Sequence, residues 1–308
     1  MGKEDEPCLI PFHKRKVHIM KKLLALLLCI VLLSACAATY DGPTETKYAL
    51  TEYTVTHYYS FFGWAEESYT SRTVYAYDIY GNRVRSMEYR DGELGSVSNM
   101  KYDDRGNLIS EKDWDHTKWI PLPDGGRTFT YDDQNRLLTT VYYGGWGKET
   151  SRSTYTYDDE ARIRTWSNDS GDVQTTWMDE NGRELRQTLD EYETVYEYDE
   201  NGNLTGSYSY ENGALIERYE ARYDDQNRQT WGGRYDADGQ LKTQTNWEYD
   251  DHSHTVTTTR PDGNVRIEYY HADGRIYMIE DYSEDGTLSM LQQYYYQEIH
   301  VPAKEATP

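Results

Sequence analysis

The sequence predicts an all-β protein: a repetitive antiparallel β-meander of hairpins that forms an open twisted ribbon or a partial coil. A short phrase recurs along the chain, tyrosine then aspartate and a turn ending in glycine or asparagine, as at Tyr77-Asp78 and Tyr102-Asp103. Between the turns, side chains alternate with a period of two, which is typical of strands with one buried face. The chain also has 32 tyrosines, and tyrosine favours the half-buried surface of a sheet.

Residues 1–19 carry no strand or helix pattern, and we interpret them as an upstream extension from a start codon assigned too early, or else as a long n-region of the signal peptide. Residues 20–35 have the features of a signal peptide, with a lysine pair followed by an apolar run from Leu23 to Leu33. This run is too short to span a bilayer, which needs about 20 apolar residues. The segment ends in Leu-Ser-Ala before Cys36, which resembles the lipobox of bacterial lipoproteins.

The lipobox resemblance implies a diacylglyceryl group on Cys36 and cleavage before it; an ordinary secretory peptide with a chance cysteine is the alternative. Two acyl chains form a stable anchor. We therefore expect a partner membrane, with the protein on the outside of the cytoplasmic membrane, at the cell surface or in an outer membrane. Cys8 and Cys29 precede the cut, so no disulfide and no thiol catalysis are expected in the mature chain.

The charge of the chain excludes one class of partner. The net charge is −22, and residues 1–35 carry six basic and three acidic side chains, so their removal takes it to −25. We expect no nucleic-acid partner, because phosphates require a basic surface. Direct docking on anionic lipid is disfavoured for the same reason. Residues 36–47 show no periodicity and are interpreted as a lipidated tether.

Residues 48–299 are predicted to be the repeat domain, and residues 300–308 a flexible tail. The turn aspartate is expected to accept hydrogen bonds from its own turn, and the residue three positions later must take positive φ, closing a type I turn with a bulge. Glycine adopts this conformation freely and asparagine tolerates it. Ala161 stands at that position in one copy, so we predict that it is strained and that Ala161→Gly stabilises the protein.

These features resemble the YD-repeat (RHS-repeat) family, whose pattern is a tyrosine-aspartate turn with glycine, then a basic or polar residue and an aliphatic one. Matching segments include residues 81–84, 106–108, 202–204, 239–241 and 274–276. In large family members the repeats coil into a spiral shell around a cargo domain. This chain is short and irregularly spaced, so the resemblance implies an open ribbon or partial coil on a bacterial lipoprotein.

Large aromatic residues are the candidate ligand-binding residues, because a row of rings suits sugars or peptides. The candidates are Trp114, Trp119, Trp146 and Trp231. The alternative is that each packs between repeats, since large aromatic side chains are usually mostly buried. Trp119 lies in a long insertion, residues 115–126, whose apolar residues are expected to fold back over an edge of the sheet.

Metal and catalytic sites are not predicted. His252 and His254 could share a metal as alternate residues, but no third ligand follows at a recognisable spacing. No nucleophile elbow, zinc-protease motif, phosphate loop or dinucleotide fingerprint occurs in the sequence. We therefore expect no catalytic residues, no metal and no cofactor.

The leading functional hypothesis is a non-enzymatic, membrane-anchored surface lipoprotein whose β-repeat scaffold binds a glycan or a protein. Two alternatives remain open: a glycan-active enzyme that uses carboxylates, and an accessory or immunity partner of a secreted YD-repeat toxin.

Overall fold

The computed structural model describes residues 44–61, 64–117 and 122–302, which form twenty β-strands and one short 3₁₀ helix. The first ten strands are β1 (Thr44–Phe61), β2 (Trp64–Tyr77), β3 (Arg83–Arg90), β4 (Glu93–Tyr102), β5 (Leu108–Asp115), β6 (Leu122–Tyr131), β7 (Leu137–Tyr143), β8 (Glu149–Asp158), β9 (Ile163–Asn168) and β10 (Val173–Met178). The remaining ten are β11 (Glu184–Leu189), β12 (Tyr192–Tyr198), β13 (Leu204–Glu211), β14 (Ala214–Tyr223), β15 (Gln229–Asp236), β16 (Leu241–Asp250), β17 (Thr255–Thr259), β18 (Val265–Tyr270), β19 (Ile276–Tyr282) and β20 (Leu288–Pro302). The 3₁₀ helix η1 (Gly145–Gly147) lies between β7 and β8.

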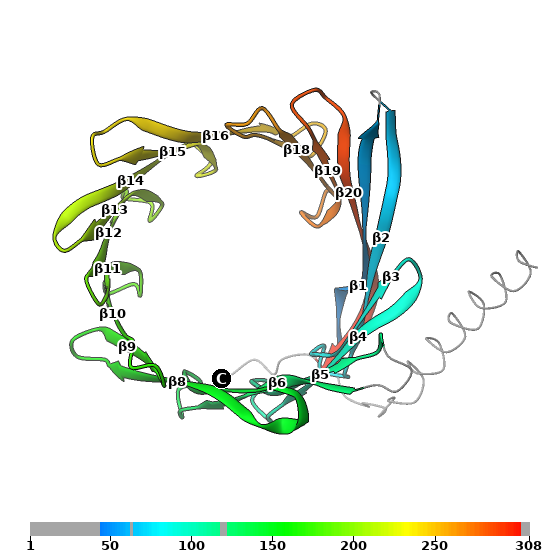
Figure 1. The fold of residues 1–308 in the computed structure, drawn as a ribbon, viewed down its shortest axis with the longest axis horizontal. Helices are drawn as coiled ribbons and strands as arrows, with labels where there is room; N and C mark the ends of the chain where they lie inside the picture. Colours follow the sequence, from blue (N-terminus) through cyan, green and yellow to red (C-terminus); the bar gives the residue numbers. More distant parts are fainter. Residues whose placement is uncertain (1–43, 62–63, 118–121, 303–308) are drawn as a thin grey trace, which may run out of the picture.

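The twenty strands close into a β-barrel, so the predicted fold class of an open twisted ribbon or partial coil is wrong. Each strand pairs antiparallel with its neighbours in sequence, and β1 also pairs antiparallel with β20, from Thr44 opposite Pro302 to His57 opposite Met290. Figure 1 shows the resulting ring. The closing pair joins residues about 245 positions apart, a contact that a local repeat pattern does not encode.

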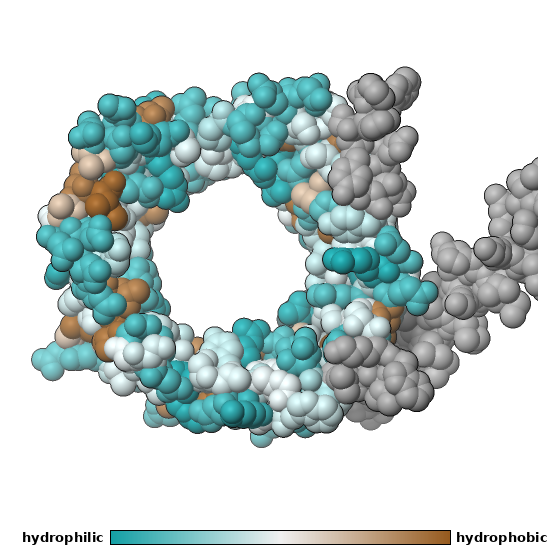
Figure 2. Space-filling model, viewed as in Figure 1, coloured by the Kyte–Doolittle hydropathy of each residue, from teal (hydrophilic) through white to brown (hydrophobic). Residues whose placement is uncertain are grey.

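The ring surrounds a wide opening, which the space-filling view in Figure 2 shows directly. Twenty strands about 4.8 Å apart make a ring roughly 30–40 Å across, depending on strand tilt. The wall is a single sheet, and its fully buried apolar side chains are few and small, such as Val301 at 2% exposure and Val141 at 5%. Stability therefore depends heavily on the strand ladders and on side-chain bonds between neighbouring units.

The two ends of the barrel differ in their turns. One end, the YD rim, carries the turns that follow the even-numbered strands, from β2 to β18; nearly all of them bear the recurring aspartate. The other end, the loop rim, carries the turns that follow the odd-numbered strands, including η1. The first residue of β1 and the last residue of β20 both lie at the YD rim, because Thr44 pairs with Pro302 there.

The predicted turn geometry is confirmed at the YD rim. In the first copy, Asp78 Oδ1 accepts the backbone N–H groups of Tyr80 and Asn82, both at 2.9 Å. Gly81 has a φ of 83° and Asn135, in an equivalent turn, has a φ of 62°. The aspartate thus fixes the turn, and glycine or asparagine provides the left-handed residue.

The strain predicted at Ala161 is wrong. The turn after β8 is one residue longer than the glycine turns, so Asp158 pairs with Ile163 and the left-handed residue is Arg162, with a φ of 56°. Ala161 instead donates its N–H to Asp158 Oδ1 at 2.9 Å. The turn after β16 is built the same way, with His254 at a φ of 53°.

The recurring tyrosines link neighbouring hairpins through their hydroxyl groups. Tyr131 at the end of β6 donates to the carbonyl oxygen of Leu108 at the start of β5, at 2.8 Å. Burial raises the pKa of Tyr131 above its ordinary value, which keeps the hydroxyl protonated as a donor. The same bond is made by six more tyrosines, at 2.6–3.0 Å: Tyr77, Tyr102, Tyr157, Tyr198, Tyr223 and Tyr249. We call the side of the sheet that bears them the tyrosine face.

Candidate functional site

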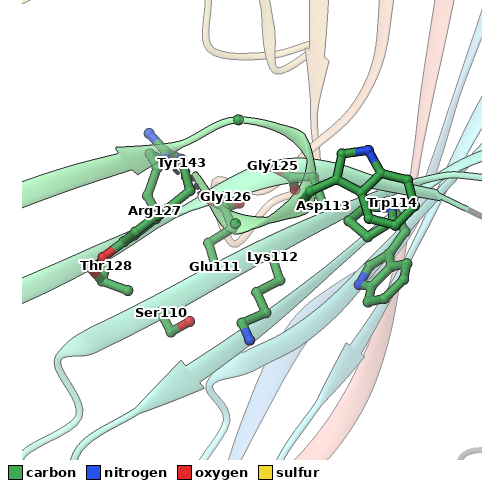
Figure 3. Close-up of a pocket in the computed structure, with 14 residues that line it drawn as sticks. Ser110, Glu111, Lys112, Asp113, Trp114, Gly125, Gly126, Arg127, Thr128 and Tyr143 are labelled. Atoms are coloured by element: carbon green, nitrogen blue, oxygen red, sulfur yellow. Dashed lines mark hydrogen bonds and ion pairs between the residues drawn. The ribbon is translucent and has the colours of Figure 1, made fainter. Parts of the chain in front are cut away.

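A groove of about 480 Å³ lies at the loop rim, between β5, β6, β7 and η1. Its aromatic side chains are Trp114, Tyr143 and Trp146, and Pro123 adds a further apolar surface. Figure 3 shows Trp114 at one end and Arg127, Thr128 and Tyr143 at the other, with glycine backbone between them. Binding pockets for small molecules commonly combine this size with aromatic lining and a few polar groups.

Two consecutive glycines in the groove let the neighbouring strands approach closely. Gly125 lies opposite Asp113 and Gly126 lies opposite Lys112, so a side chain is missing on each face of the sheet. Their φ values of 137° and 153° lie where other residues are strained. A Cβ atom on Gly125 would lie 2.5 Å from the carbonyl oxygen of Tyr143, and one on Gly126 would lie closer still to that of Glu111. No side chain fits at either position.

Trp146 is held in an unfavourable backbone conformation and left in solvent. It lies in η1 with a φ of 68° and is 80% exposed. A left-handed conformation costs a residue other than glycine about 1–2 kcal/mol, and an exposed indole gains little from packing. Strained residues of this kind concentrate at functional sites. Trp146 is therefore the strongest sign of a binding role in this groove.

The two acidic side chains that line the groove, Glu111 and Asp113, already form hydrogen bonds within the protein. Arg127 donates from Nε to Glu111 Oε2 at 3.0 Å, and its Nη2 contacts the same oxygen. This pairing raises the pKa of the Arg127 guanidinium. Asp113 accepts the hydroxyl of Ser98 at 2.5 Å. Neither carboxylate is placed as a free acid or base, which disfavours the glycan-active enzyme.

The structure brings together two of the four predicted aromatic residues. Trp114 and Trp146, 32 positions apart in the sequence, line the same groove. Trp231 lies elsewhere in the ring, on β15, under Arg222 at 4.4 Å and within 3.4 Å of Gln244 Oε1. Trp119 and the lipidation residue Cys36 lie outside the described residues. Gly125 and Gly126 were not predicted as site residues, although two adjacent glycines within a strand signal a close backbone approach.

Metal binding and membrane-spanning helices are not found in the described part of the chain. No group of three or more His, Cys, Asp or Glu residues there could hold a metal ion. His252 and His254 occupy the turn after β16, where Asp250 Oδ1 accepts the N–H of His252 at 2.9 Å. No described helix has the length and apolar character needed to cross a membrane.

No protein-family model matches the chain, and no curated protein matches it. Solved structures with a likeness to it include a TcdB2–TccC3 toxin complex and the Tc holotoxin pore of Photorhabdus luminescens. Each has 13% identity and a TM-score of 0.26, over 75% of this chain but only 16% of the toxin chain. A porin-like protein from Bacteroides uniformis has 10% identity and a TM-score of 0.36, over 80% of this chain and 96% of that one.

At these TM-scores the likenesses carry no argument about function, which therefore rests on the residues of this chain.

Proposed function

We propose that this chain is a non-enzymatic glycan-binding protein that uses its barrel as a rigid scaffold and the groove at the loop rim as its binding site. The observation that supports this most strongly is Trp146, an exposed indole held at a φ of 68° beside a second indole, Trp114. Aromatic side chains present a flat apolar surface together with a polar N–H. This combination suits the apolar face and the hydroxyl groups of a sugar ring.

The scaffold favours this function because hydrogen bonds hold the backbone at both tryptophans. Trp114 belongs to β5, which pairs along its length with β4 and β6. η1 is closed by backbone bonds from Gly144 N–H to the Lys148 carbonyl and from Gly147 N–H to the Gly144 carbonyl, at 2.9 and 3.2 Å. Groups held on paired strands lose little freedom on binding, so more of the contact energy appears as affinity.

Substitution of Trp146 separates a binding role from a packing role. Trp146→Gly should lower affinity for the bound glycan at least tenfold, because a stacking surface is lost. The same change should raise the free energy of unfolding by about 0.5–1 kcal/mol, because glycine relieves the left-handed strain. Binding would be measured by calorimetry against cell-wall polysaccharides, and stability by urea unfolding.

Trp231→Ala is the matched control, since Trp231 lies outside the groove; it should leave affinity unchanged. A Trp146→Gly protein that binds normally, or that is less stable than the parent, would contradict the proposed role of Trp146.

We further propose that the barrel is held at a membrane through a lipid on Cys36. Thr44 is eight positions after Cys36, so the anchor lies within about 28 Å of the YD rim. Charged residues stand at mid-strand on both sides of the wall, for example Lys112 and Glu111 on successive positions of β5. A sheet with charged side chains on both faces is compatible with water on both faces, whereas a membrane-spanning barrel has an apolar outer face. With the YD rim nearest the lipid, the groove at the loop rim faces away from the membrane.

The anchor is tested by Cys36→Ala, which should move the protein from the membrane fraction to the soluble fraction and abolish incorporation of labelled fatty acid. Cys29→Ala removes a cysteine that precedes the cleavage point and should change neither property. Retention of the label in the Cys36→Ala protein would refute the anchor.

A further inference from the structure

Three cations cluster on one side of β3, β4 and β5, next to the groove. Strand register places Arg85 opposite Asn99 and Asn99 opposite Lys112, while Lys101 lies opposite Ser110. Cross-strand partners share a face of the sheet. Arg85, Lys101 and Lys112 therefore lie together on the face opposite the tyrosine face, and Trp114, two residues after Lys112, lies on it as well.

These cations have no carboxylate partner in the residues that the structure describes. Arg85 donates from Nε to the amide oxygen of Asn99 at 2.8 Å, which leaves its charge uncompensated. Lys101 and Lys112 are exposed, and neither forms an ion pair with a described carboxylate. From β2 to β7, no paired position on this face is an aspartate or glutamate. Glu149 of β8, opposite Tyr143 of β7, forms an ion pair with Arg152.

The same strands carry their acidic residues on the tyrosine face. Glu88, Glu111 and Asp113 all lie there, each next in sequence to a residue on the opposite face, which bears Arg85, Lys101 and Lys112. Like charges on neighbouring strands are destabilising, and a chain with a net charge of −22 has many carboxylates available to pair with lysine. The cations are thus kept apart from the protein's own carboxylates. Such a cluster is well placed to bind an anionic group of a ligand.

The cations and the indole are spaced for one ligand. Lys112 and Trp114 are alternate residues of β5, so their Cβ atoms lie about 6–7 Å apart on the same face. Gly126 opposite Lys112 carries no side chain, and the backbone of Glu111 and Lys112 lies directly against it. Ser110 and Thr128 lie opposite each other on this face and add two hydroxyl groups.

We infer that the ligand of the groove is an anionic glycan, whose sugar ring stacks on Trp114 and whose carboxylate or phosphate is held by Lys112 and Lys101. This inference rests on the proposed glycan binding and makes it more specific. Neutral glycans bind through the indoles alone and hence more weakly. The bond to the anion is charge-assisted and weakens as salt is added.

The test measures binding of the full chain to three probes: polygalacturonate, its methyl ester and a glycerol-phosphate polymer. Methyl esterification removes the charge and keeps the sugar ring. We expect polygalacturonate to bind about tenfold more tightly than its ester, because one charge-assisted hydrogen bond contributes roughly that factor. Tight binding of the phosphate polymer instead of the uronate would identify phosphate as the anion.

Lys112→Gln should lower affinity for the anionic probe about tenfold, since it removes one charge-assisted bond, and should leave affinity for the ester unchanged. Lys242→Gln, an exposed lysine on β16 outside the groove, is the matched control and should change neither affinity. Far-ultraviolet circular dichroism checks that each variant is folded.

The outcomes distinguish the two proposals. Equal affinity for polygalacturonate and its ester, both lost in Trp114→Ala, overturns the anionic ligand and leaves glycan binding intact. Binding of both polyanions that is lost in Lys112→Gln but survives Trp114→Ala overturns the stacked-sugar geometry. Failure of every charged and neutral glycan to bind overturns both.

Discussion

At the scale of single residues, the repeated tyrosine-aspartate motif forms the turns between strands. Its aspartate accepts two backbone N–H groups, its glycine or asparagine supplies positive φ, and its tyrosine ties one hairpin to the next. Turn chemistry is local, so the sequence predicted the conformation of Gly81 and Asn135. It failed at Ala161, because the loop after β8 contains an additional residue and the left-handed position moves to Arg162.

Arg162→Gly is therefore expected to stabilise the protein by about 0.5–1 kcal/mol, because it relieves a left-handed backbone at an exposed position. Ala161→Gly, with no positive φ to relieve, should destabilise it by about 0.5–1 kcal/mol through added chain entropy. Urea unfolding midpoints compare the two variants with the parent. Greater stability of the Ala161→Gly protein would show that the turn is built differently.

At the scale of the strand and hairpin, tyrosine has two roles: it fills space on one face of the sheet and donates to the neighbouring unit. The alternation of tyrosine with charged residues predicted the strands, and the turn signals predicted where they end. The groove was predicted only in part. Trp114 and Trp146 were identified by size, but their meeting depends on Gly125 and Gly126, which let β5, β6 and β7 approach closely. A sequence pattern shows which residues are large and does not show which ones meet.

Tyr131→Phe tests the role of the tyrosine hydroxyl. It removes the 2.8 Å bond to the Leu108 carbonyl and keeps the ring, so it should lower the free energy of unfolding by about 0.5–1.5 kcal/mol. Tyr142→Phe is the control, since Tyr142 is 38% exposed, and it should have little effect. Equal effects of the two changes would show that the hydroxyl bond contributes nothing.

At the scale of the whole molecule, the deciding contact is the pairing of β1 with β20. The sequence predicted antiparallel hairpins along most of the chain, but pairing between its first and last strands leaves no periodic signal. The two strands are long, 18 and 15 residues, and Ala49 and Val301 are buried at 7% and 2% exposure. Closure also removes the two free edges that an open ribbon would expose.

Deletion of residues 288–308 should therefore cause aggregation, because it exposes the edges of β1 and β19. Size-exclusion chromatography with light scattering would measure the change. Deletion of residues 303–308, which follow β20, removes none of the described strands and should leave the elution volume of the parent unchanged. A truncated protein without β20 that keeps the parent's oligomeric state and unfolds cooperatively would show that the β1–β20 pairing is dispensable.

The antiparallel pairing of β1 with β20 also limits how the number of strands in such a ring can change during evolution. When every neighbour in a closed sheet runs antiparallel, the number of strands must be even, and here it is twenty. Gain or loss of a whole hairpin preserves this parity, whereas gain of one strand would force a parallel pair somewhere in the wall. Duplication of a single repeat would thus widen the opening in discrete steps, and relatives of this protein should differ in length by multiples of one hairpin.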